Sequence, residues 1–168
     1  MQETIDFYRE KKIGFVNFTV DAESQMGRAR ISNEEIADAA AANSDIMIAF
    51  GSIDPHKGKM GAREARRLVE RHGVKGFKFH SAVQGFEPAD KMDWPIYEVI
   101  NEHKLPAIFH SGHSGIGSGM RLQNSNPMLL EDVVIAFPDM QIVIAHPAGP
   151  GETKPSPWPC TSPTSGST

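Results

Sequence analysis

Short apolar runs alternate along the chain with longer segments in which apolar residues recur every third or fourth position. Short runs rich in β-branched and aromatic residues are typical of strands, and the longer spacing is typical of amphipathic helices. The predicted strands are residues 13–20, 45–50, 74–80, 105–110 and 141–146. The predicted helices between them are residues 34–42, 61–72, 94–103 and 128–137. Strands that alternate with helices of this length predict right-handed βαβ units and a parallel sheet.

Two of these helices carry recognisable end signals. Asn33 suits the N-cap of the first helix, where Glu34 and Glu35 complement the positive end of the helix dipole. Gly73 follows the second helix directly and is a natural stop.

Five parallel strands fit either an open doubly wound sheet or a segment of a barrel. No Gly-rich phosphate fingerprint follows the first strand, so a dinucleotide-binding sheet has no support. Three of the later strands end in histidine, and the carboxyl-terminal rim of a (β/α)₈ barrel is where that fold places its chemistry. The pattern therefore favours a segment of a barrel.

The strand that ends in His80 has two different faces, because alternate residues of a strand point to opposite sides. Phe77 and Phe79 share one face, where aromatic side chains suit packing under outer helices. Lys78 and His80 share the other face, which we expect to point into the barrel near its rim.

The same parity places Ile108 with His110 and Ile144 with His146. Three successive strands are therefore expected to bring His80, His110 and His146 to one edge. Neutral imidazoles bind divalent metals such as zinc, and a histidine outside the metal shell can act as a general acid or base.

The remaining polar candidates have weaker signals. His113 follows His110 by three residues in a Gly/Ser-rich loop and could reach the pocket, although a solvated position is the simpler interpretation. Asp21 and Asp54 follow strand ends, where turn and cap roles compete with substrate contact. Ser111 lacks a nucleophile-elbow context, so acyl-enzyme chemistry is unsupported.

Composition excludes several classes of protein. The 168 residues suffice for one ordinary domain, and a net charge of -4 disfavours a nucleic-acid binder. A single cysteine, Cys160, excludes an internal disulfide and a cysteine-rich zinc site. No apolar run is long enough to span a bilayer, and the first twelve residues lack a signal-peptide core, so we expect a cytoplasmic protein with no membrane partner.

The last segment, residues 148–168, differs from the rest because it is rich in Pro, Ser, Thr and Gly and has no periodicity. By composition it reads as a disordered tail. A shifted reading frame is the alternative: with suitable synonymous codons, the neighbouring frame encodes Trp-Pro-Trp, an acidic and then apolar helix, and the start of a strand.

Four segments together resemble the amidohydrolase-related proteins of the metal-dependent hydrolase superfamily. They are residues 73–80 (GVKGFKFH), 105–117 (LPAIFHSGHSGIG), 125–128 (SNPM) and 142–147 (IVIAHP). More narrowly, they are similar to the branch that contains aminocarboxymuconate-semialdehyde decarboxylase and γ-resorcylate decarboxylase. The resemblance implies a (β/α)₈ (TIM) barrel with a metal at its rim, of which this chain would hold roughly strands two to six.

The resemblance also implies roles for individual residues. His110 corresponds to a metal ligand of the family, and His146 to an active-site acid or base. His80, Lys78 and His113 would lie beside the site as substrate-binding or supporting residues. The histidine pair of the first family strand and the aspartate of the eighth have no counterpart in this sequence.

The resulting prediction is a partial barrel domain over residues 1–147 and a non-native or disordered tail over residues 148–168. The family continues after its sixth strand much as the shifted frame does, which favours the frameshift explanation. The parent would be a metal-dependent hydrolase or decarboxylase of a small carboxylated or cyclic substrate, with zinc as the expected metal. Homo-oligomerisation of the parent is compatible with this interpretation.

Two other functions remain open at this stage. The chain could be a non-catalytic fragment, because it holds too few of the family's metal ligands and a partial barrel leaves open sheet edges and exposed apolar faces. It could also be a small-molecule binding module with an open sheet.

Overall fold

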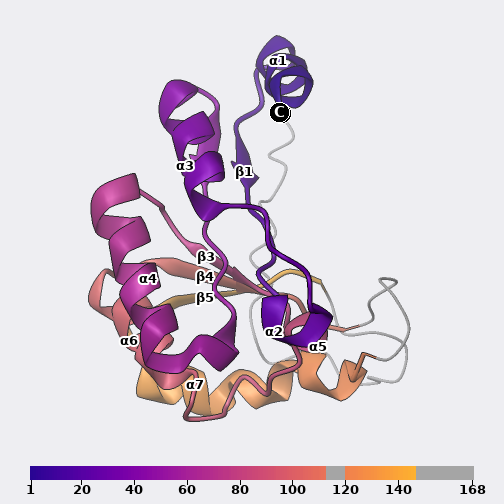
Figure 1. Ribbon diagram of the computed structural model, residues 1–168, viewed down its shortest axis with the longest axis vertical. Coiled ribbons are helices and arrows are strands. Elements are labelled where there is room, and N and C mark those ends of the chain that lie inside the picture. Colours follow the sequence, from indigo (N-terminus) through magenta and orange to yellow (C-terminus); the bar gives the residue numbers. More distant parts are fainter. Residues whose placement is uncertain (113–119, 147–168) are drawn as a thin grey trace, which may run out of the picture.

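The computed structural model describes residues 1–112 and 120–146 of the chain. Its five short strands pair in parallel and follow one another in chain order (Figure 1). One pair and one triplet make up the sheet: β1 (Phe15–Asn17) with β2 (Met47–Ala49), and β3 (Phe77–Phe79) with β4 (Pro106–Phe109) and β5 (Gln141–Ile144).

Backbone hydrogen bonds join the pair to the triplet. The amide of Gly51 donates to the carbonyl of Gly76 at 2.9 Å, and the amide of Lys78 donates to the carbonyl of Gly51 at 2.8 Å. Among the described residues, β1 and β5 are the outer strands, and the sheet stays open.

The first helix precedes the first strand, and the other helices lie between consecutive strands, as the alternating pattern predicted. The helices are α1 (Gln2–Glu10), α2 (Glu23–Met26), α3 (Asn33–Ala42), α4 (Gly58–His72), α5 (Ser81–Gln84), α6 (Trp94–Glu102) and α7 (Glu131–Ala136), with short 3₁₀ helices at Pro55–Lys57, Leu122–Ser125 and Pro127–Leu130. The helices α4 and α6 pack against each other beside β3 and β4, and α1 lies at the opposite end of the molecule from α7 (Figure 1).

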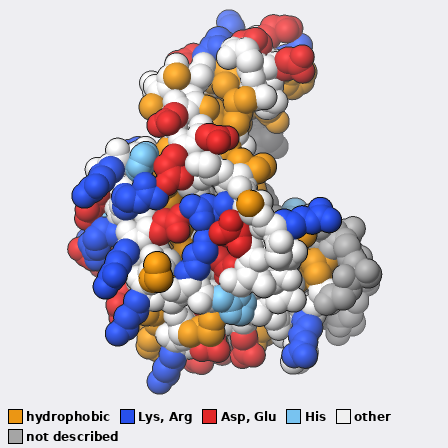
Figure 2. All heavy atoms as spheres, viewed as in Figure 1, with side chains coloured by type: hydrophobic (Ala, Val, Ile, Leu, Met, Phe, Trp, Pro, Cys, Tyr) orange, Lys and Arg blue, Asp and Glu red, His pale blue; other side chains and the backbone are white. Residues whose placement is uncertain are grey.

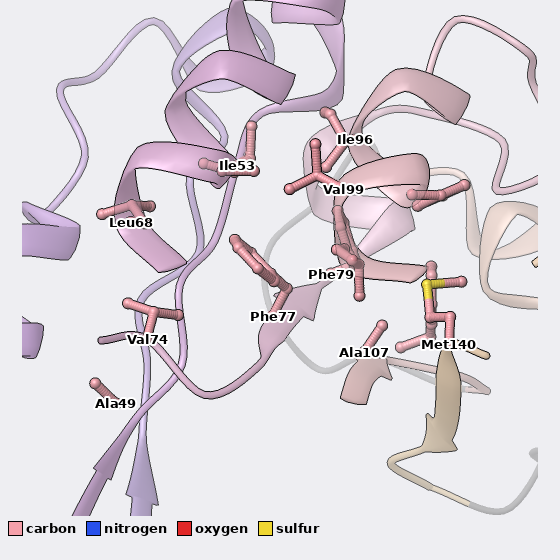
Figure 3. Packing of buried hydrophobic residues seen from close by; sticks show 14 of the residues in the cluster. Ala49, Ile53, Leu68, Val74, Phe77, Phe79, Ile96, Val99, Ala107 and Met140 are labelled. Carbon is pink, nitrogen blue, oxygen red and sulfur yellow. The ribbon is translucent and has the colours of Figure 1, made fainter. Parts of the chain in front are cut away.

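Aromatic residues on the helix-facing side of β3 and β4 form the centre of the core. Phe77 and Phe79 are fully buried, which confirms the face predicted from strand parity. The ring of Phe79 stacks on Phe109 with centroids 5.0 Å apart and meets the edge of Tyr97 from α6. Figure 3 shows these strand residues facing apolar side chains of α4 and α6, among them Leu68.

The predicted elements are confirmed, but the strands are shorter than expected and one cap differs. The N-cap of α3 is Ser32, whose hydroxyl accepts from the amide of Glu35, so the assignment of Asn33 as the cap is wrong. Asn33 instead makes two hydrogen bonds to the backbone of Ser52, which tie α3 to the segment after β2. Gly73 ends α4 in the left-handed conformation at φ 68°, as predicted.

The last predicted helix, residues 128–137, divides into two parts. The 3₁₀ helix Pro127–Leu130 precedes α7, and the side chain of Asn126 caps it by accepting from the amide of Met128 at 3.0 Å. The proline at the first position favours a helix start there, one residue before the predicted one.

The register of β5 contradicts one step of the parity argument. Val143, not Ile144, pairs with Ile108, so Ile144 lies opposite Phe109 on the core side of the sheet. Consecutive residues of a strand alternate faces. Because the sequence of β5 is offset by one position from those of β3 and β4, its residues point to the opposite faces from those expected. His146 thus lies beyond the last paired residue, in a bend.

The face of the sheet away from the helices leaves apolar side chains in solvent. Val16 of β1 and Ile48 of β2 are direct partners in the ladder, and they remain 38% and 45% exposed. This agrees with the exposed apolar face expected of a partial barrel. His113 and the tail at residues 148–168 lie outside the described residues. No helix within the described ranges has the length and apolar character needed to cross a membrane.

Candidate active site at the carboxyl ends of the strands

Three histidines gather where β3, β4 and β5 end. His80 and His110 directly follow β3 and β4, and their rings lie 3.8 Å apart between centroids with an angle of 12° between their planes. The ring of His146 meets that of His110 edge-on, with centroids 4.8 Å apart. The predicted meeting of the three side chains is therefore confirmed, while their chemical roles stay predictions.

His80 is fixed by a buried glutamine. The side-chain oxygen of Gln84 accepts from the amide of His80 at 2.7 Å, and its nitrogen donates to the carbonyls of Asp21 (2.7 Å) and Ile53 (2.9 Å). One amide group thus ties together the segments after β1, β2 and β3. Burial and, to a smaller extent, charge on His110 together lower the pKa of His80 to about 4, so His80 is a neutral imidazole at neutral pH.

His110 and His146 are held by the backbone of β3 and by Ser111. The amide of His110 donates to the carbonyl of Phe79 at 3.0 Å. The hydroxyl of Ser111 donates to the carbonyl of His146 at 2.6 Å, which draws the bend after β5 toward β4. This bond explains how His146 reaches His110 although the register of β5 is offset. The hydroxyl of Ser111 therefore stabilises the fold at this bend. His146 itself is exposed to solvent.

Lys78 lies on the same face of β3 as His80 and is only 5% exposed. Its ammonium nitrogen has no hydrogen-bond partner in the described part of the chain and lies 5.8 Å from the centre of the Phe18 ring. Burial lowers the pKa of Lys78 to about 8.

The aspartates that follow β1 and β2 serve the fold. Asp21 is fully buried and accepts from the ammonium of Lys57 at 2.7 Å and from the amide of Asp54 at 3.1 Å. Asp54 accepts from the amides of Ser24 (2.7 Å) and His56 (3.0 Å). The turn and cap roles are thus the ones that the structure shows.

A buried carboxyl group near this end of the molecule was missed by the sequence analysis. Asp93 precedes α6 and is fully buried, yet neither of its carboxyl oxygens has a hydrogen-bond partner within the described residues. Burial raises the pKa of Asp93 to about 8, with smaller contributions from Asp90 and Asp54. An aspartate before a helix normally indicates an exposed cap, so no signal in the sequence marks its burial.

The described residues offer too few ligands for a complete metal site. His110 offers an imidazole at the rim, but the described residues contain no cluster of three or more His, Cys, Asp or Glu side chains that could hold a metal ion. A catalytic zinc site usually needs three protein ligands. The described residues therefore do not fit a bound metal by themselves, and no catalytic step through a metal follows from them.

The family of this chain follows from a comparison of its sequence with known families. Residues 3–159 match the amidohydrolase family. The chain belongs to the amidohydrolase family. No curated protein matches the sequence.

Solved structures with the same fold include enzymes and one uncharacterized protein. An uncharacterized TIM-barrel protein from Bordetella bronchiseptica has 19% identity and a TM-score of 0.64, over 82% of this chain and 49% of that one. A 5-carboxyvanillate decarboxylase from Novosphingobium aromaticivorans, with bound manganese, has 23% identity and a TM-score of 0.55, over 67% and 37% of the two chains. A 2,6-dihydroxybenzoate decarboxylase from Rhizobium has 12% identity and a TM-score of 0.54, over 85% and 45%.

These similarities establish the fold of this amidohydrolase-family chain as part of a (β/α)₈ barrel. The chain spans about half the length of the structures it matches, or less. Its alternating strands and helices and its open sheet agree with the predicted partial barrel.

Proposed function

We propose that this chain forms the middle part of the active-site rim of an amidohydrolase-family enzyme that acts on a small aromatic carboxylate. The observation that carries the proposal is the contact of His110 with His80 and His146, from three successive strands, at the end of the barrel where this fold places its chemistry. Decarboxylation is the favoured reaction because two of the similar structures are decarboxylases of aromatic acids.

Each histidine has a separate task in this proposal. His110 is the metal ligand, as the family resemblance implies, and His146 is the catalytic acid or base. The exposed ring of His146 can exchange protons with solvent, whereas His80 stays neutral and packs against His110. His80, Lys78 and His113 would contact or support the substrate.

In a decarboxylation, the protonated ring of His146 would donate a proton to the ring carbon that bears the carboxylate. The bond from that carbon to the carboxylate then breaks, and carbon dioxide leaves. In the alternative, a hydrolysis, the neutral ring would accept a proton from the attacking water. A histidine can serve either reaction near neutral pH, so its identity does not decide between them.

The metal of the complete enzyme is proposed to be divalent. The 5-carboxyvanillate decarboxylase binds manganese, and zinc is the ion that the family resemblance implies. Because the described residues do not supply three ligands, we expect the chain alone to bind metal weakly and to lack turnover. A non-catalytic fragment is thus the second candidate function, supported by this same shortage of ligands.

The test uses manganese as a paramagnetic probe of the histidine rings in the isolated chain. Sub-stoichiometric Mn²⁺ should broaden the ring resonances of His110 and His146 before those of His72, which lies at the end of α4. The variant H110A should abolish the selective broadening at His146, while H72A should leave it unchanged. Equal broadening of all three rings, or unchanged broadening in H110A, would exclude His110 as the metal-binding residue.

A second measurement addresses turnover. The chain is incubated with Mn²⁺ and 2,6-dihydroxybenzoate, and release of carbon dioxide is followed. We expect no release above the uncatalysed background. Release that disappears in H146A would show that the chain is a complete catalyst and would contradict the expected loss of activity.

A further inference from the structure

A buried ammonium group without a counter-ion lies beside the three histidines. Lys78 is 5% exposed, and its ammonium nitrogen has no hydrogen-bond partner among the described residues. Taking a charged group out of water without a partner costs several kcal/mol, so such a group either loses its proton or waits for an anion. Since its pKa falls only to about 8, most Lys78 side chains remain protonated at pH 7.

The backbone of Lys78 is fixed on both sides, which limits where its side chain can go. Its amide donates to the carbonyl of Gly51 at 2.8 Å, and its carbonyl accepts from the hydroxyl of Ser52 at 2.9 Å. Ser52 is itself held by Asn33, which bonds to its amide and its carbonyl. The ammonium is therefore presented from a rigid part of the sheet, as a preorganised binding group requires.

Phe18 covers the ammonium from the segment after β1. Its ring centre lies 5.8 Å from the ammonium nitrogen, a cation–π distance, and its side chain remains 38% exposed. One side of the ring faces the cation and part of its surface lies in solvent, so an aryl group can pack on the exposed part. Aromatic ligands gain from such stacked or edge contacts.

We propose that Lys78 and Phe18 form the subsite for the aromatic carboxylate. The carboxylate binds the ammonium of Lys78, and the aryl ring of the ligand packs on Phe18, next to His80 and His110. This inference rests on the proposed function, because it takes the small aromatic carboxylate from there. It adds the two residues that discriminate charge and aromaticity.

The arginine-rich cleft on α4 is the competing anion site. Arg63, Arg66, Arg67 and Arg71 line it, and Figure 2 shows basic side chains gathered along this side of the molecule. Two of these arginines already have carboxylate partners, Arg66 in Glu102 and Arg67 in Glu34. The cleft offers no ring like that of Phe18 to bind an aryl group. Anions of different shapes should therefore bind to this cleft with similar affinity.

Three ligands of nearly equal size separate charge from aromaticity. Benzoate carries both features, benzamide lacks the charge, and cyclohexanecarboxylate lacks the aromatic ring. Their dissociation constants are measured at pH 7 by isothermal titration or ligand-observed NMR, for the wild-type chain and four variants. The variants are K78M and F18L, with K75M and F7L as controls at exposed positions.

The wild-type chain should bind benzoate about tenfold or more tightly than benzamide, since a charge-assisted hydrogen bond is worth at least that ratio. K78M should remove this preference, and F18L should remove the preference for benzoate over cyclohexanecarboxylate. K75M and F7L should keep both. Methionine is a close match for the buried stem of lysine, so K78M is expected to fold.

Three outcomes would overturn the inference: no saturable binding of benzoate, equal binding of benzoate and benzamide, or benzoate binding by K78M that equals the wild type. Substitutions R63A and R71A identify binding to the cleft on α4, because they would weaken all anions equally. The manganese experiment is independent of these results. If manganese does not select His110 but K78M loses benzoate, the proposed function fails and the carboxylate subsite stands.

Discussion

The imidazole of His80 lies flat against that of His110, with ring centroids 3.8 Å apart and planes 12° apart. Two rings in this arrangement cannot easily both carry a proton, because like charges at such a distance repel strongly. Burial is the first cause of the low pKa of His80, and the charge of His110 is the second. The stacked pair therefore favours one neutral histidine beside one that can take another role.

The first prediction concerns the titration of this pair. His80 should titrate near pH 4, and H110F, which removes a titratable ring but keeps an apolar one, should raise its pKa. The check is a carbon-13 NMR titration of the histidine rings, with added free imidazole as the reference. A midpoint for His80 near 6.5, the ordinary value for histidine, would contradict this effect of burial.

The lowered pKa of His80 also predicts how the stability of the chain depends on pH. The folded pKa of His80 is depressed, so the unfolded chain binds more protons between about pH 4 and 6.5. Its contribution to the free energy of unfolding is therefore present above pH 6.5 and is lost as pH falls toward 4.

The second prediction concerns Asp93, where the sign is opposite. In the folded chain the pKa of Asp93 is raised from 3.8 to about 8. The contribution of Asp93 to the free energy of unfolding is therefore fully present below pH 4 and is lost as pH rises through 8. D93N should remove this loss and stabilise the chain by roughly 2 kcal/mol at pH 9, with little effect at low pH. Urea unfolding at several pH values measures this, with D139N at an exposed position as the control. An equal gain at every pH would contradict it.

The third prediction is that Lys78 destabilises the fold. A buried ammonium without a partner is costly, and K78M replaces it with an apolar chain of similar length. The variant should unfold at pH 7 with a free energy about 1–3 kcal/mol higher than the wild type. The control K75M should change it by less than about 0.5 kcal/mol. A loss of stability in K78M would show that Lys78 has a stabilising partner.

The fourth prediction concerns a glycine that permits close packing. A Cβ atom at Gly76 would lie 2.4 Å from ring atoms of Phe50, which directly follows β2 and is buried. G76A should therefore destabilise the chain by about 1–3 kcal/mol, the usual cost of overpacking. Gly14 is the control because a Cβ atom there makes only an ordinary 3.7 Å contact. Thermal unfolding of both variants tests the difference, and equal effects would contradict it.

The extent of prediction from sequence differed between the fold and the site. The order of strands and helices followed from the alternation of short apolar runs with longer amphipathic segments. The register of β5 did not follow, because parity within one strand does not fix its offset from the next. The Ser111 hydroxyl that brings His146 to His110 depends on that register, so it was not predictable either.

Three features of the site were outside the reach of single-sequence reasoning. Phe18 lies 60 positions before Lys78, the burial of Asp93 depends on the packing of distant segments, and Gln84 joins three loops through one amide. Each depends on long-range contacts that hydrophobic periodicity does not encode. The family resemblance supplied the roles of His110 and His146, which geometry alone does not assign.

The central claim is that the rim between β1 and β4 binds an aromatic carboxylate. The most direct test is to locate bound benzoate on the isotope-labelled chain by intermolecular nuclear Overhauser effects. The account predicts contacts from the benzoate ring protons to the ring of Phe18 and to the side-chain methylenes of Lys78. Contacts to the side chains of Arg63 and Arg71 instead, with none to Phe18, would contradict it.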